Sequence, residues 1–468
     1  MAAPPGRTLL ACAVLALAAP PAAAQGRSAL HRALVHDSLP NGLQVIVLEN
    51  HTVPLATLEV VVRNGAFTQS PSEEGYAHLF EHLLFRAYGW GNASFGIAAT
   101  HLDAAYNGET REENVSYYLL LPSSNLESGL HLLARLVEHP RFGSGDLDRE
   151  RAVVIDEMSR DGSDPVRALR EEVDERLWGS AWSYKDLIGT ADVIRAATPK
   201  RLERVFERFY VPNNAALVIG GDVDPARAIE VARRAFGGWD RAPDPFAGWH
   251  EPTIPPLRQS QAVVVTSPDA ANATIVMEWQ GPSVLRDREA TYAADVLSDV
   301  LASPMSNFQQ HLVGSGTFQS VSIGYQTLAR TGPIVLTAVT RRDRLRPALI
   351  ALGTELMQLA DSGYITPEEL AAAKKAREVR SAFELESGTS MAHTLAYWWS
   401  VAGLDYYESY VASMARCTPR QIRDYARTYI VNRAASIGVL TTPDLATDAQ
   451  RAVIDIFGGG HVTAGDGR

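Results

Sequence analysis

The chain has 468 residues, of which 46% are hydrophobic and 21% are charged. This composition is typical of a folded protein, and at roughly 100–200 residues per domain it indicates two to four domains, so wholesale disorder and collagen-like repeats are excluded. The net charge of −11 gives no preference for nucleic acid, and two cysteines cannot build a disulfide-rich scaffold. Composition therefore indicates a large multi-domain protein and names no activity.

The N-terminus has the pattern of a secretory signal. Arg7 precedes an apolar run over residues 9–19, and an alanine-rich cleavage pattern ends at Ala24. The apolar run is shorter than the roughly 20 residues that span a bilayer. A lipoprotein signal at Cys12 is an alternative, but little apolar sequence precedes it. We therefore expect residues 1–24 to be a cleaved signal peptide and the mature protein to be exported, to the periplasm or out of the cell.

Strand-like and helical patterns alternate along the chain. Apolar runs typical of strands occupy residues 43–48, 56–62 and 115–121. Helical patterns occupy residues 126–138, 146–158 and 165–177. Because several strands are near neighbours in sequence, the pattern favours an α+β fold over a strict alternation of parallel strands and helices. We expect two homologous α/β-sandwich halves, each a mostly antiparallel sheet packed with helices.

The two halves contain a repeat. Thr198-Pro199 and Thr418-Pro419 each open a helical stretch, and each stretch runs to a Tyr-x-x-Asn pattern followed by an apolar strand. Two matched blocks in the same order indicate a duplication. Proline clusters between the halves and predicts a stiff connector. The expected organisation is a signal peptide at 1–24, an N-terminal domain at 28–240, a linker at 241–256, a homologous C-terminal domain at 257–455 and a flexible tail at 456–468.

The chemical centre of the sequence is His78-Leu79-Phe80-Glu81-His82. On a helix, positions i, i+3 and i+4 share one face, so His78, Glu81 and His82 project together. Two imidazoles spaced in this way can bind one Zn²⁺, and the carboxylate between them can take a proton from metal-bound water. This is the H-x-x-E-H arrangement.

A tetrahedral zinc site needs a third protein ligand, and the segment 150–158 can supply it. Glu150 and Glu157 lie seven residues apart on one helical face, about 10.5 Å along the axis, so one would bind the metal and the other would orient the site. Spacing alone does not choose between them, and Asp156 also remains open.

His78-x-x-Glu81-His82 followed by Glu157 resembles the pitrilysin/insulinase family of zinc metallopeptidases, which includes the mitochondrial processing peptidases. Asn107-Gly108-Glu109-Thr110 is similar to the edge-strand motif of that family, with Gly108 in place of the usual Ala. Further similarity lies in the blocks around residues 150–157, 209–214 and 220–222, so the resemblance covers nearly the whole mature chain.

The resemblance implies a function for each motif. His78, His82 and Glu157 would hold one Zn²⁺, Glu81 would be the general base, and Glu150 would assist catalysis from nearby. The strand Asn107-Gly108-Glu109-Thr110 would pair with an extended peptide substrate, a mode that reads main chain.

One departure from the family pattern changes the expectation. Members that act alone carry an Arg and a Tyr seven residues apart in the C-terminal half, where they bind the substrate carbonyl. Val313 and Ser320 stand at these positions here, although a shifted alignment could use Tyr325 or Arg330. Losing such donors typically costs on the order of 10²–10³ in rate for each. We therefore expect the zinc-bearing catalytic subunit of a heterodimer, with a homologous partner that lacks the zinc motif and supplies the Arg/Tyr pair.

The sequence thus predicts a zinc-dependent endopeptidase or oligopeptidase that acts on unfolded peptides in an exported compartment. A non-catalytic metal-binding core or peptide-binding subunit of an assembly is the alternative, although such proteins usually lose the zinc motif. A metal-dependent hydrolase of another bond is a third interpretation, against which the edge-strand motif argues. We expect no nucleic-acid partner and no membrane span.

Overall fold

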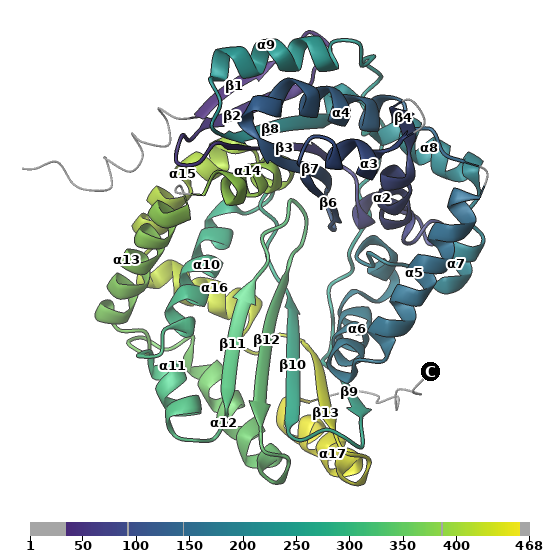
Figure 1. Cartoon of the computed structure of the whole chain (residues 1–468). Helices are drawn as coiled ribbons and strands as arrows, with labels where there is room; N and C mark the ends of the chain where they lie inside the picture. The colour runs from purple at the N-terminus through teal and green to yellow at the C-terminus, as the bar shows by residue number, and fades with distance from the viewer. Residues whose placement is uncertain (1–33, 91–92, 144, 385–386, 459–468) are drawn as a thin grey trace, which may run out of the picture.

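A computed structural model of the chain describes residues 34–90, 93–143, 145–384 and 387–458. The expected signal peptide at 1–24 therefore lies outside the described residues. Figure 1 shows two sheet-and-helix halves that face each other across the molecule. Among the helices that the structure describes, none is long and apolar enough to cross a membrane.

The N-terminal half is built on a six-stranded sheet in the order β1-β2-β8-β3-β7-β6. Only β2 and β8 run parallel, and the other neighbours are antiparallel. The strands are β1 (Leu34–Ser38), β2 (Gln44–Glu49), β3 (Leu55–Val62), β6 (Ala105–Thr110), β7 (Val115–Pro122) and β8 (Ala215–Gly221), and a separate pair is β4 (Tyr88–Trp90) and β5 (Ala93–Ser94). The helices are α2 (Tyr76–Arg86), α3 (Phe95–Thr100), α4 (Leu126–Glu138), α5 (Asp146–Gly162), α6 (Pro165–Trp178), α7 (Ala191–Arg195), α8 (Pro199–Phe209) and α9 (Pro225–Phe236).

The C-terminal half is built on a five-stranded sheet in the order β11-β12-β10-β13-β9. Here only β13 and β9 are parallel. The strands are β9 (Gln261–Thr266), β10 (Ala273–Gln280), β11 (Ser320–Tyr325), β12 (Pro333–Thr340) and β13 (Ser436–Thr441). The helices are α10 (Arg288–Ala302), α11 (Asn307–Gln309), α12 (Leu345–Gln358), α13 (Pro367–Glu384), α14 (Gly388–Val401), α15 (Leu404–Arg416), α16 (Pro419–Tyr429) and α17 (Ala446–Phe457).

The predicted α+β fold with mostly antiparallel sheets is therefore confirmed. The repeated helix starts are α8 and α16, where Thr198 and Thr418 cap the first turn and a proline follows at the first helical position. Each of these helices leads into the strand that pairs in parallel with the first long strand of its half, namely β8 with β2 and β13 with β9. Helix α17 continues to Phe457, so the first two residues of the expected tail at 456–468 are helical instead.

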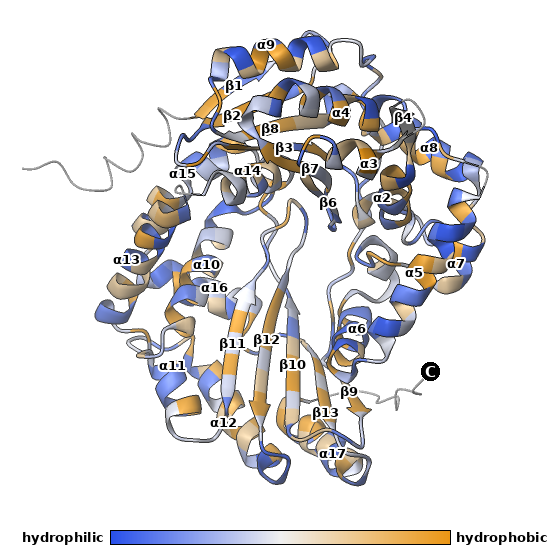
Figure 2. Ribbon diagram, in the orientation of Figure 1, coloured by the Kyte–Doolittle hydropathy of each residue, from blue (hydrophilic) through white to orange (hydrophobic). Residues whose placement is uncertain are grey.

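Each half contributes one helix that packs on the sheet of the other half. Helix α14 of the C-terminal half covers β2, β3 and β8, and α6 of the N-terminal half covers β9, β10 and β13. The first contact buries an apolar cluster that includes Ile46, Val218 and Leu395. The second buries a cluster that includes Val173 and Val276. Figure 2 shows the strands of both sheets as mainly apolar, which explains why both faces of each sheet must be covered.

Candidate metal centre

Helix α2 presents the two histidines on one face. Its N-cap, Gly75, has a φ of 76°, and a Cβ there would lie 2.1 Å from the carbonyl oxygen of Ile188, so only glycine fits this entry into the helix. Leu79 and Leu83 point into the core of the N-terminal half. The opposite face therefore carries His78 and His82, whose rings meet edge to face with centroids 4.7 Å apart.

Helix α5 brings Glu157 against the two histidines. The Nε2 atoms of His78 and His82 lie 3.3 Å apart, and Oε2 of Glu157 lies 3.9 Å from the first and 3.6 Å from the second. Ligands about 2.0–2.1 Å from a tetrahedral zinc ion lie about 3.4 Å from each other. These three donors therefore fit around a single ion, and they form the one such group found among the described residues.

Glu150 occupies a different place in the centre. Its Oε2 lies 3.3 Å from Nδ1 of His82, on the side of the ring away from Glu157, and its Oε1 accepts a hydrogen bond of 2.6 Å from Nε of Arg86. The side chain of Glu150 is only 3% exposed. A carboxylate that accepts the second N–H of a metal-binding imidazole fixes its tautomer and orientation.

Burial sets the protonation state of His78. It lowers the pKa of His78 to about 4, with a further contribution from His82, so the ring is neutral near pH 7, as a metal ligand must be. Nδ1 of His78 is buried and has no hydrogen-bond partner among the described residues. Nε2 of the neutral ring, which lies near His82 and Glu157, is therefore available to bind an ion.

Glu81 lies beside the three donors. It is 8% exposed, and burial raises the pKa of its carboxyl above the usual range. Thr110 Oγ1 of strand β6 donates a hydrogen bond of 2.7 Å to Glu81 Oε2. A raised pKa makes the carboxylate a stronger base, which suits a general base.

Strand β6 forms one edge of the N-terminal sheet. Among the described strands only β7 pairs with it, so its outer side can pair with an added strand. Gly108 and Thr110, which pair in register with Tyr117 and Val115 of β7, lie on the face of β6 that packs on α2. Asn107 and Glu109 lie on the other face, because successive residues of a strand point to opposite faces. The backbone of β6 thus passes directly over Glu81.

Comparison with known proteins identifies the family. The family model described as "Insulinase (Peptidase family M16)" matches residues 44–190, and the model described as "Peptidase M16 inactive domain" matches residues 196–377. Together they cover most of the chain. The chain belongs to the insulinase family of peptidases, M16. It is a zinc protease of that family, as the resemblance implied.

Individual relatives agree with this assignment. An uncharacterized zinc protease of Streptomyces coelicolor is 23% identical over 415 residues, which are 86% of this chain and 88% of that protein. An uncharacterized zinc protease of Mycobacterium leprae is 26% identical over 75% of this chain and 79% of that protein. A solved protease from Helicobacter pylori has a TM-score of 0.77 at 19% identity and covers 87% of this chain and 99% of that one. The periplasmic protease PqqL from Escherichia coli has a TM-score of 0.72 at 16% identity over 92% of this chain and 51% of that one.

In this M16 chain the structure brings His78, His82 and Glu157 together, with Glu81 beside them. Asp156 points elsewhere, because its exposed carboxylate pairs with Arg160 at 3.4 Å. Sequence reasoning missed Arg86, although it lies four residues after His82 on the same helical face and the spacing could have indicated it.

The structure also locates the residues discussed for the missing Arg/Tyr pair. Val313 packs against the core of the C-terminal half, and Ser320 begins β11 with an exposed side chain. Tyr325 donates its hydroxyl proton to the carbonyl oxygen of Pro282 at 2.9 Å, and Arg330 pairs with Glu113 at 3.4 Å. Val313, Tyr325 and Arg330 are thus engaged in other contacts, and Ser320 faces solvent. Figure 1 shows β11 in the half opposite α2.

Proposed function

We propose that this M16 zinc protease is an endopeptidase or oligopeptidase that hydrolyses unfolded peptides and works as the catalytic subunit of a heterodimer. The observation that carries the proposal is the convergence of three donors, spaced 3.3–3.9 Å apart, beside a buried carboxylate and an unpaired strand edge. These are the parts needed for metal-assisted hydrolysis of an extended chain.

In this proposal His78, His82 and Glu157 hold the zinc ion, which the zinc protease relatives and the donor set both favour. Zinc, when bound, supplies Lewis acidity that makes a water nucleophilic near neutral pH and polarises the scissile carbonyl. Glu81 accepts the proton of the attacking water at its carboxylate and later donates it to the leaving amine. Glu150 holds the His82 ring in place through Nδ1, and Arg86 in turn fixes Glu150.

The substrate is held by strand addition. The residues Asn107, Gly108, Glu109 and Thr110 present main-chain N–H and C=O groups at the outer edge of β6. A peptide can pair with this edge only when it is extended, so folded proteins are excluded. Thr110 links the two functions, because its hydroxyl contacts Glu81 while its backbone belongs to β6.

A partner subunit would complete the site. Val313 has no hydrogen-bond donor in its side chain, the Ser320 hydroxyl is too short to replace a phenol, and Tyr325 and Arg330 are already engaged. We therefore assign the missing donors to a homologous chain that lacks the zinc motif. The chamber between the two chains would confine the substrate to short, unfolded peptides.

The catalytic assignment is tested with Glu81→Gln and His78→Ala. We expect Glu81→Gln to keep about one zinc ion per chain and to lose peptide turnover, because the amide keeps the shape of Glu81 but cannot take a proton. His78→Ala should lose the zinc ion and the activity together. Metal analysis and a quenched-fluorescence peptide assay measure both properties. Turnover that persists in Glu81→Gln would contradict the role of Glu81.

The partner assignment is tested by comparing the purified chain with the chain supplied with a homologous subunit that carries an Arg/Tyr pair. We expect the mixture to exceed the single chain by at least about 10²-fold in kcat/KM. Full activity of the single chain refutes the heterodimer. A zinc-loaded chain that stays inactive with such a partner would instead support the non-catalytic alternative.

We also propose that the protein acts in the periplasm after removal of residues 1–24. The signal pattern of the sequence supports this location, and the structural neighbour PqqL is described as periplasmic. N-terminal sequencing of the protein from a periplasmic fraction should begin at Gln25. An intact N-terminus on cytosolic material would overturn the location.

A further inference from the structure

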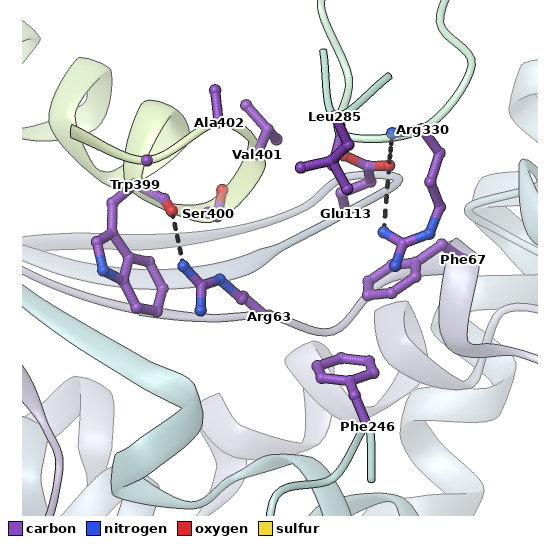
Figure 3. A pocket seen from close by; sticks show the side chains of 12 residues that line it. Arg63, Phe67, Glu113, Phe246, Leu285, Arg330, Trp399, Ser400, Val401 and Ala402 are labelled. Carbon is purple, nitrogen blue, oxygen red and sulfur yellow. Dashed lines mark hydrogen bonds and ion pairs between the residues drawn. The ribbon is translucent and has the colours of Figure 1, made fainter. Parts of the chain in front are cut away.

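A cavity of about 310 Å³ lies where the two halves and their connecting segment meet. Its walls come from the end of β3, from the connecting segment, from the loops of the C-terminal half and from the end of α14, and they include Arg63, Phe67, Phe246, Leu285, Arg330 and Trp399. Figure 3 shows Arg63 beneath Trp399 on one side of the cavity and Arg330 above Phe67 on the other. The donors of the metal centre do not line it.

The charge of Arg330 is already compensated. Its guanidinium pairs with Glu113 and stacks over the rings of Phe67 at 4.1 Å and Trp249 at 4.9 Å. Glu113 also accepts hydrogen bonds from the backbone N–H groups of Ala329 and Arg330, at 2.5 Å and 2.9 Å. This side of the cavity is therefore close to neutral.

Arg63 differs from Arg330 in having no counter-ion among the described residues. One N–H of its guanidinium donates to the carbonyl oxygen of Trp399 at 3.0 Å, and the group lies 4.0 Å from the centre of the Trp399 ring. No carboxylate in the described part of the chain forms an ion pair with Arg63. Burial lowers the pKa of the guanidinium, and the charge of Asp244 opposes this shift. A partly buried cation without a paired anion is costly, so the site favours an incoming negative charge.

Apart from Ser400, the side chains of the remaining walls are apolar. Phe67, Phe246 and Val401 face the cavity, and Leu285 at its rim is 64% exposed, so solvent and small molecules reach it. A cavity of this size falls at the lower end of the range for ligand pockets. Its lining combines Arg63, which has no ion-pair partner in the part of the chain that the structure describes, with aromatic and aliphatic surface. This lining suits a ligand with a single negative charge and an apolar body.

We propose that this cavity binds an organic carboxylate with an aromatic or aliphatic body, held by a charge-assisted pair between its carboxylate and Arg63. Two sources share this chemistry, a free carboxylic acid of the size of an acylated amino acid and the C-terminal end of a peptide. Because the walls come from both halves, the bound ligand bridges them and stabilises their observed arrangement. The site is distinct from the metal centre, because His78, His82 and Glu157 are not among the residues that line it.

The test uses the full-length zinc-loaded protein and four probes. These are N-acetyl-phenylalanine, its neutral amide, and a pentapeptide of D-amino acids ending in D-phenylalanine with a free or an amidated C-terminus, since D-residues resist hydrolysis. Binding is followed by calorimetry and by the fluorescence of Trp399 and its neighbours. We expect the free acid to bind at least tenfold more tightly than the amide and to raise the melting temperature. If the peptide with a free C-terminus binds more tightly than the amidated peptide, the site also accepts the C-terminal ends of peptides. If the two peptides bind equally, the site is restricted to free carboxylic acids.

Three variants distinguish binding at Arg63 from binding elsewhere on the protein. Arg63→Met should weaken binding of the acid at least tenfold, whereas Arg344→Met, at an exposed arginine, should leave it unchanged. His82→Ala should also leave it unchanged, because the acid does not bind at the metal centre. Without ligand, Arg63→Met should keep or raise the melting temperature, since it removes an unpaired charge and keeps an apolar stem beside Trp399.

Several outcomes would overturn the proposal. Equal affinity for the acid and the amide, unchanged binding in Arg63→Met, or loss of binding in His82→Ala each excludes a carboxylate site at Arg63. A lower melting temperature of Arg63→Met, combined with no effect of the acid on the wild type, would show that Arg63 only joins the two halves.

Discussion

Gly108 shows at the scale of a single residue how closely strand β6 packs on helix α2. A Cβ at this position would lie 2.9 Å from Cζ of Phe85 and 3.0 Å from Oε1 of Glu81. The Phe85 ring has little room to move, because it packs against the rings of Phe95, Tyr106 and Tyr117. Phe85 and Glu81 thus occupy the space that a side chain at position 108 would need.

We therefore expect Gly108→Ala to lower kcat/KM about tenfold or more while zinc content stays unchanged. The added methyl displaces Glu81 or shifts β6, and small displacements of reacting groups are costly. Adding Phe85→Leu to this variant should recover part of the loss, because the shorter side chain frees the space. Peptide kinetics and metal analysis on the single and double variants measure this. Full activity of Gly108→Ala alone would show that the contact with Phe85 does not constrain the site.

At the scale of the elements, the reciprocal helices depend on glycines in the strands they cover. A Cβ at Gly438 of β13 would lie 2.4 Å from Cγ2 of Val173 and 2.6 Å from Cδ1 of Leu169, both on α6. In the other half, a Cβ at Gly220 of β8 would lie 2.7 Å from the carbonyl oxygen of Gly388, the first residue of α14. Because these glycines have no side chain, α6 packs closely on β13 and α14 packs closely on β8, and each helix covers one face of a sheet.

Gly438→Ala should lower the free energy of unfolding by about 1–3 kcal/mol, the typical cost of overpacking a close contact. Gly324→Ala is the matched control, because Gly324 lies in β11 with nothing within 4 Å of its added Cβ. The control should be neutral or slightly stabilising, since alanine restricts the unfolded chain. Urea denaturation of both variants gives the comparison. Equal stability of the two variants would mean that α6 adjusts freely on β13.

At the scale of the whole molecule, the exchange of α6 and α14 makes the halves depend on each other. Without α14, the N-terminal sheet would expose Ile46, Leu48, Val61, Ala216 and Val218, which that helix covers. Polar contacts reinforce the junction, since His393 of α14 lies 2.6 Å from the buried Glu59 carboxylate, and Thr57 donates to Thr389 at 2.9 Å. Each half has a core of its own on one face of its sheet, but the other face is covered by a helix of the other half.

We expect the intact protein to unfold in one calorimetric transition. The N-terminal half expressed alone, as residues 34–256, should bind a hydrophobic dye and self-associate because its sheet face is uncovered. Co-expression with residues 257–458 should restore a monodisperse complex. Two separate transitions in the intact chain, or a monodisperse N-terminal half, would show that the halves fold independently.

Features that depend on local spacing could be predicted from the amino-acid sequence. The placement of His78, Glu81 and His82 on one helical face follows from helix periodicity, and the caps at Thr198 and Thr418 with their prolines follow from local hydrogen bonding. The mostly antiparallel α+β fold also followed from the order of the apolar runs. These features need few contacts between distant parts of the chain.

The remaining features of the site depend on how segments far apart in the sequence pack against each other. The position of α5 across α2 placed Glu157 near both imidazole Nε2 atoms and Glu150 at Nδ1 of His82, a choice that spacing along one helix left open. The exchange of α6 and α14, the contact of Phe85 with Gly108 and the unpaired Arg63 beside Trp399 each join segments far apart in sequence. Such contacts depend on how complete surfaces pack together, and no local pattern encodes that fit.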